Sequence, residues 1–64
     1  MKLDKEKTLI AQAKAKKTTA EVCSSAVITS AMYRRAYEKG CRPATAGKIA
    51  EALGVPVTDI IEEV

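Results

Sequence analysis

This chain offers cations rather than catalytic groups for a functional site. Arg34 and Arg35 stand side by side, with Tyr37 two positions later. The sequence has no histidine, and so lacks the commonest acid–base group near neutral pH and the commonest metal ligand. Cys23 and Cys41 are 18 positions apart with no second pair, which does not match a zinc site. We therefore expect no enzyme activity, no metal, no cofactor and no small-molecule substrate.

The charges are distributed unevenly along the sequence. All eleven Lys and Arg lie in residues 1–48 with four acids, a formal charge of +7, whereas residues 49–64 carry −4. This asymmetry favours a face that meets a polyanion, although a solvated surface is the alternative. No apolar run is long enough to enter a membrane, so we expect a cytoplasmic protein with reduced thiols. Sixty-four residues predict one domain over 1–64, near the lower size limit for independent folding.

Helical patterns cover most of the chain, and no segment shows the alternation of a strand. The sequence predicts an all-α domain with five helices, at about residues 4–16, 19–26, 30–38, 44–53 and 57–63. Asp4 can cap the first helix, Thr18 or Thr19 the second, and Thr29 the third. Gly40 and Gly54 should end the third and fourth helices, and Pro43 suits a first helical turn.

The positions that each helix buries follow from its spacing. In the first helix the apolar stripe should be Leu9, Ile10 and Ala13. The fourth helix should bury Ala46, Ile49, Ala50 and Leu53, and the third should bury Met32, Tyr33 and Ala36 with Tyr37 at the edge. Because Tyr33 is large for a core position, we expect its hydroxyl at the surface. The opposite face of the third helix should expose Ser30, Ala31, Arg34 and Arg35.

Two short helices that meet near residues 26–29 suggest a helix-turn-helix, in which the second helix enters the major groove of DNA. Arg35 would then reach a guanine edge or a phosphate, and Arg34 would meet the backbone. The alternative is a solvated helix face with an Arg34–Glu38 pair, which contributes only tenths of a kcal/mol. The helix alone leaves both interpretations open.

Two longer stretches bear a resemblance that goes beyond these patterns. TAGKIAEALGVPVTDIIEE (residues 45–63) and the looser TAEVCSSAVITSAMYRR (residues 19–35) resemble the Cro/C1-type (XRE) helix-turn-helix family of phage and bacterial regulators. The resemblance covers roughly residues 8–63 and implies a compact five-helix, lambda-repressor-like fold. Val27 stands where the family has glycine, at a position that often has a left-handed backbone and is costly for a β-branched residue.

The resemblance implies a sequence-specific, DNA-binding transcriptional regulator, expected to be a repressor and a homodimer on double-stranded DNA. The residues it places at bases are Thr29, Ser30, Ala31 and Arg35. The residues it places at the DNA backbone are Thr18, Thr19, Arg34, Lys39, Arg42 and Thr45. The last helix would supply a dimer interface of Val57, Ile60, Ile61 and Val64. The alternative is a protein-interaction module on the same fold, such as an antitoxin or a phage-encoded binder of a host protein.

Overall fold

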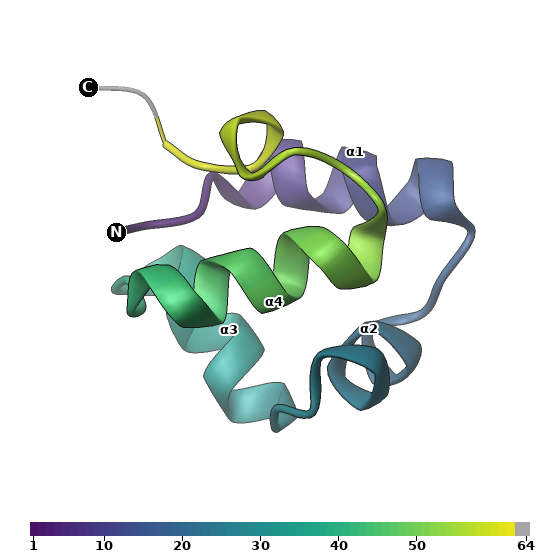
Figure 1. Ribbon diagram of the computed structural model, residues 1–64, viewed down its shortest axis with the longest axis horizontal. Coiled ribbons are helices and arrows are strands. Elements are labelled where there is room, and N and C mark those ends of the chain that lie inside the picture. Colours follow the sequence, from purple (N-terminus) through teal and green to yellow (C-terminus); the bar gives the residue numbers. More distant parts are fainter. Residues whose placement is uncertain (63–64) are drawn as a thin grey trace.

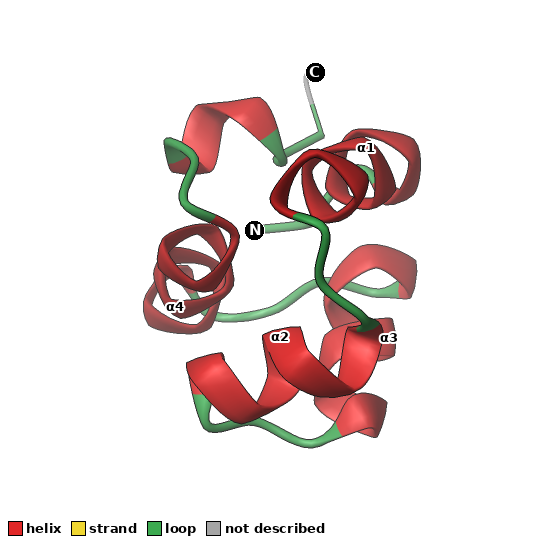
Figure 2. Ribbon diagram, turned by 90° about the vertical axis from the view of Figure 1, so that its right-hand side faces the viewer, coloured by secondary structure: helices red, strands yellow, loops and turns green. Residues whose placement is uncertain are grey.

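The computed structural model describes residues 1–62. Its elements are α1 (Lys5–Ala15), α2 (Thr19–Ala26), α3 (Ser30–Glu38), α4 (Pro43–Leu53) and the 3-10 turn η1 (Val57–Asp59). Helix α4 packs against α2, α1 and η1. In Figures 1 and 2, α1 and η1 lie on one side of α4, while α2 and α3 lie on the other. The described residues form a compact all-α globule without strands, and none of their helices is long and apolar enough to cross a membrane.

The first four helices begin and end within a residue of their predicted bounds, and predicted side-chain caps lie at the start of three of them. The Asp4 carboxylate and the Thr29 hydroxyl accept N–H bonds from the first turns of α1 and α3, at 2.9 and 3.1 Å. Thr18, rather than Thr19, caps α2: its hydroxyl accepts from the Glu21 N–H, and the Glu21 carboxylate accepts from the Thr18 N–H. This reciprocal pair satisfies two amides that a helix start otherwise leaves unbonded.

The prediction of a fifth helix over residues 57–63 is wrong. The chain forms only the 3-10 turn η1 and then extends, so that Ile61 pairs with Leu3 in an antiparallel bridge. The Asp4 N–H donates to the Ile60 carbonyl at 2.8 Å. A seven-residue helix is marginal by itself, and these bonds to the beginning of the chain satisfy the same backbone groups while burying Leu3 and Ile60. Residue 63 lies outside the described residues.

The core-facing side of α1 also differs from the prediction. Leu9 and Ile10 are 45% and 49% exposed, whereas Thr8 and Ala11 are buried. Thr8 can be buried because its hydroxyl donates to the Asp4 carbonyl at 2.7 Å, which leaves no unpaired polar group in the core. The apolar volume next to α1 is supplied instead by residues before and after the helices.

In α3 and α4 the predicted core positions are mostly confirmed. The α4 stripe is buried as predicted, at Ala46, Ile49, Ala50 and Leu53. In α3, Tyr33 and Ala36 are buried, but Met32 is 44% exposed, which contradicts its predicted core position. The Tyr33 hydroxyl is also not at the surface. It donates to the Gln12 side-chain oxygen at 2.8 Å, and burial raises the pKa of Tyr33 to about 12.

Candidate nucleic-acid interface

The turn between α2 and α3 sets the direction in which α3 leaves α2. Val27 has φ 57° and ψ 50°, a left-handed conformation, and its side chain is 85% exposed. The N–H groups of Val27 and Ile28 bond to the Ser24 and Cys23 carbonyls, at 3.3 and 3.0 Å, which closes the end of α2. A non-glycine residue in this conformation costs about 1–2 kcal/mol. The short turn therefore keeps a strained valine at the surface.

Helix α3 is held by its buried face and leaves the opposite face free. Tyr33 bonds to Gln12 of α1, and its ring meets Tyr37 edge-to-face with centroids 5.9 Å apart. These contacts fix the rotation of α3 about its own axis. As predicted, the α3 residues of the outward face and their N-cap are all exposed: Thr29, Ser30, Ala31, Arg34 and Arg35.

The first of two hollows beside α3 lies between α3 and the start of α2, and we call it the α2-side hollow. It measures about 240 Å³, and its walls include four of the predicted contact residues: Thr19, Ser30, Ala31 and Arg34. The rings of Tyr33 and Tyr37 form the rest of its lining. Small side chains from the first turn of α3 therefore lie beside one long cation. This arrangement allows a ligand to approach the helix start closely while its charge meets the guanidinium.

The second hollow lies on the other flank of α3, at the connector to α4, and we call it the α4-side hollow. It measures about 550 Å³ and combines Arg35 and Thr45 with Arg42. Arg42 precedes α4 without a side-chain cap, so the first-turn amides of α4 add their partial positive charge to the two guanidinium groups. The hollow is therefore suited to an anion.

Sequence patterns missed two neutral members of the α4-side hollow. Met32 lines it because this side chain is exposed rather than buried. Cys41 also lines it, and partial burial raises the pKa of its thiol. A raised pKa keeps the thiol protonated near neutral pH, so its contribution is an apolar one. Only the relative placement of α3 and α4 reveals these two residues.

Not every predicted contact residue joins the two hollows. The Thr18 and Thr29 hydroxyls are occupied by the caps of α2 and α3, and Lys39 is exposed at the end of α3. None of these three residues lines either hollow. Lys17, although cationic, donates to the Ala52 carbonyl at 2.7 Å and so joins the start of α2 to the end of α4. The sequence alone gives no signal for that long-range bond.

The residues predicted at a dimer interface have different environments. Ile60 is completely buried within the chain and is not available to a partner. Val57 and Ile61 are half-buried against the core, and Val64 lies outside the described residues. The predicted dimer surface therefore has little exposed apolar area in the described part of the chain.

The described residues contain no group of three or more His, Cys, Asp or Glu side chains placed to hold a metal ion. The features that this surface does offer are the exposed start of α3 and three arginines on its two flanks. Comparison of the chain with models of protein families, with curated proteins and with solved structures finds no match.

Proposed function

We propose that this protein is a sequence-specific DNA-binding domain that places α3 in the major groove and acts as a transcriptional regulator, a repressor. The observation that carries the proposal is the outward face of α3, where small residues at the helix start are followed by Arg34 and Arg35 on separate flanks. The order of the four helices fits the lambda-repressor-like fold implied by the sequence resemblance, with η1 in the place of its fifth helix.

Base recognition falls to the start of α3. Thr29, Ser30 and Ala31 have short side chains, so the helix can enter the groove until its backbone lies close to the base edges. The Ala31 methyl group can contact a thymine methyl group. Arg35, one turn later, is long enough to donate two parallel hydrogen bonds to the O6 and N7 atoms of a guanine.

Backbone contacts fall to the flanks of α3. Thr19 and Arg34 lie on one side, and Arg42 and Thr45 lie on the other together with the uncapped amides of α4. Groups on both flanks can bind phosphates of the two strands that border a groove, which fixes the position of the helix without reading sequence. The net charge of +3 favours the same partner.

A selection of bound sequences from random DNA duplexes tests this proposal. We expect enrichment of one short half-site, and affinity for that site should fall steeply as salt rises because phosphate contacts release counterions. Unrelated duplexes should bind far more weakly than the selected site at the same salt.

Two outcomes would contradict the proposal. Equal binding to all duplexes would leave a non-specific polyanion binder. No binding at low salt would remove DNA as the partner and favour the protein-interaction alternative, which a pull-down for a stoichiometric protein partner would then address.

A further inference from the structure

One side-chain amide of α1 is bonded to both helices of the candidate interface. The Tyr33 hydroxyl of α3 donates to the Gln12 side-chain oxygen at 2.8 Å. The nitrogen of the same amide donates to the hydroxyl oxygen of Thr19, the first residue of α2, at 3.4 Å. Thr19 and Tyr33 both line the α2-side hollow, whereas Gln12 lines neither hollow. Gln12 therefore holds two walls of this hollow without forming part of it.

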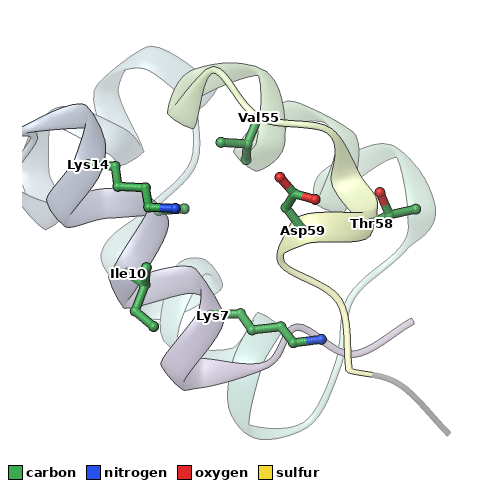
Figure 3. Close-up of a pocket in the computed structure, with 7 residues that line it drawn as sticks. Lys7, Ile10, Lys14, Val55, Thr58 and Asp59 are labelled. Atoms are coloured by element: carbon green, nitrogen blue, oxygen red, sulfur yellow. The ribbon is translucent and has the colours of Figure 1, made fainter.

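Gln12 lies on the side of α1 that faces α2 and α3. The other side of α1 borders an open groove of about 300 Å³ between α1 and η1, which Ile10 and Lys14 line. Figure 3 shows the Lys14 side chain extending from α1 toward this groove. Gln12 is two positions from Ile10 and from Lys14, so at about 100° per residue it lies on the opposite side of the helix. Substitutions of Gln12 therefore act on the candidate interface and leave the groove unchanged.

The direction of the two hydrogen bonds determines what the Thr19 hydroxyl can do. Tyr33 donates its proton to Gln12, and Gln12 donates an amide proton to the Thr19 oxygen. The Thr19 O–H itself has no acceptor among residues 1–62. A hydroxyl whose oxygen already accepts one bond is a stronger donor, because successive hydrogen bonds polarise one another. Thr19 is therefore prepared to donate to an acceptor in the α2-side hollow.

The groups around this hydroxyl favour an acceptor that is an anion. The Arg34 guanidinium belongs to the same hollow. The N–H groups of Thr19 and Ala20 lie in the first turn of α2, where the Thr18 side chain accepts only from the Glu21 N–H. Guanidinium, amides and hydroxyl are all donors, and a phosphate oxygen of the DNA backbone is an acceptor that fits them together.

We propose that Gln12 is a positioning residue for a phosphate contact: it holds the Thr19 hydroxyl as a donor to one DNA phosphate and does not touch DNA itself. This role rests on the DNA-binding function proposed above. Because Tyr33 anchors the amide, the same bonds also fix the position of the phosphate contact relative to α3. A phosphate contact carries no sequence information, so Gln12 contributes to affinity for every duplex and leaves base preference unchanged.

A double-mutant cycle between Gln12 and Thr19 tests this role. Thr19→Val removes the hydroxyl with little change of shape, and Gln12→Met removes both hydrogen bonds of the amide. Each variant should weaken binding to the selected duplex and to an unrelated duplex about tenfold. Since Gln12 acts through Thr19, the double variant should bind no more weakly than either single variant. A purely structural role of Gln12 would instead make the two losses multiply.

A carboxylate at position 12 tests the direction of the bond to Thr19. A carboxylate only accepts, so in Gln12→Glu the Thr19 hydroxyl donates to it and no longer to a phosphate. Ala13→Glu is the matched control, because it adds the same charge at an exposed neighbouring position outside the network. Gln12→Glu should therefore bind DNA about tenfold more weakly than Ala13→Glu at the same salt concentration.

The Tyr33 hydroxyl loses its partner in Gln12→Met, which can lower the stability of this variant. Combining Gln12→Met with Tyr33→Phe removes both polar groups, and this pair should fold like wild type while binding DNA as weakly as Gln12→Met. Circular dichroism and thermal unfolding show whether each variant is folded at the temperature of the binding assay.

The possible failures separate this role from DNA binding itself. Folded Gln12→Met protein that binds as tightly as wild type would overturn the role of Gln12 and leave DNA binding in place. Losses that multiply in the cycle, or equal losses in Gln12→Glu and Ala13→Glu, would do the same. Wild-type protein that binds no duplex would remove the DNA-binding function and the role of Gln12 together.

Discussion

Arg34 and Arg35 are neighbours in sequence but line different hollows on the two flanks of α3. If α3 reads DNA, Arg35→Ala should relax preference at one base pair, with a cost of about 1–3 kcal/mol on the preferred site. Arg34→Ala should weaken binding to all duplexes alike. Because it removes one phosphate contact, it should also lower the slope of log affinity against log salt concentration by about one. Competition binding against every single-base variant of the selected site, at several salt concentrations, measures both effects.

The two arginine variants control for each other. Both side chains are exposed, so neither substitution should change the thermal unfolding midpoint appreciably. A uniform loss of affinity in Arg35→Ala would assign Arg35 to the backbone rather than to a base.

The left-handed conformation of Val27 gives a prediction for stability. Val27→Gly should stabilise the protein by about 1 kcal/mol, because the relief of strain exceeds the extra flexibility that glycine gives the unfolded chain. Lys16 is the matched control, since its φ is also 57° at a helix end but its side chain is not β-branched. Lys16→Gly should therefore stabilise less. Urea unfolding measures both, and a destabilised Val27→Gly would mean that the exposed side chain makes a stabilising contact.

At the scale of an element, the cap of α2 makes the stability of the folded protein depend on pH in the acidic range. The Thr18 amide and hydroxyl bond to Glu21 and hold the pKa of its carboxyl below the ordinary value. A lowered pKa in the folded state means that the stabilisation is present above the ordinary pKa and is lost as pH falls through the folded one. Stability should therefore decline below about pH 4.3, the ordinary value for a glutamate.

The variant Glu21→Gln isolates this contribution. Glutamine keeps an oxygen that can accept from the Thr18 N–H but does not titrate, so its unfolding midpoint should fall less steeply with acid. Glu51→Gln, on the exposed face of α4, is the control and should retain the wild-type slope. Equal slopes in all three proteins would show that the cap does not set the acid dependence.

Elements whose signals are local could be predicted, and those that depend on distant partners could not. The side-chain caps at the starts of α1, α2 and α3 and the glycines at the ends of α3 and α4 are local signals. The buried side of α1 depends on Leu3 and Ile60, which fill the space beside it and leave Leu9 outside. The predicted fifth helix is replaced by η1 because residues 60–62 form backbone hydrogen bonds with Lys2 and Asp4, which lie far away in the sequence.

In the candidate site, too, the features with local sequence signals could be predicted and those that depend on distant partners could not. The helical spacing of α3 correctly predicted that Arg34 and Arg35 are exposed. The spacing within one helix cannot show that Arg35 lies beside Arg42 and Thr45, because that depends on how α4 is placed against α3. The spacing also predicts that Met32 lies in the core. The placement of α4 against α3 instead leaves a hollow beside this position, so Met32 is exposed there.

For the whole molecule, Leu3 and Leu9 show how much stability depends on one position of a small core. Leu3 is completely buried and Leu9 is nearly half exposed. Leu3→Ala should destabilise by about 2–5 kcal/mol, against a total of roughly 3–10 kcal/mol for a domain of this size. Leu9→Ala should change stability by less than about 1 kcal/mol. Urea unfolding at low protein concentration, where any dimer is dissociated, compares them.

Similar losses in the two leucine variants would contradict the predicted role of Leu3. A large loss in Leu9→Ala alone would place the core on the other side of α1. A small loss in both would mean that the segment before α1 adds little to the folded state.

The pairing of Leu3 with Ile61 also sets an order of events during protein synthesis. A ribosome makes residues 1–15 before residues 60–62, so the bonds that Lys2 and Asp4 form with residues 60–62 cannot form until the later segment has emerged. Helices α2 to α4 can meet earlier, because their contacts are closer along the chain. The segment before α1 therefore reaches its final position only after residues 60–62 have been made, and a nascent chain that stalls before residue 60 exposes Leu3 to chaperones and proteases.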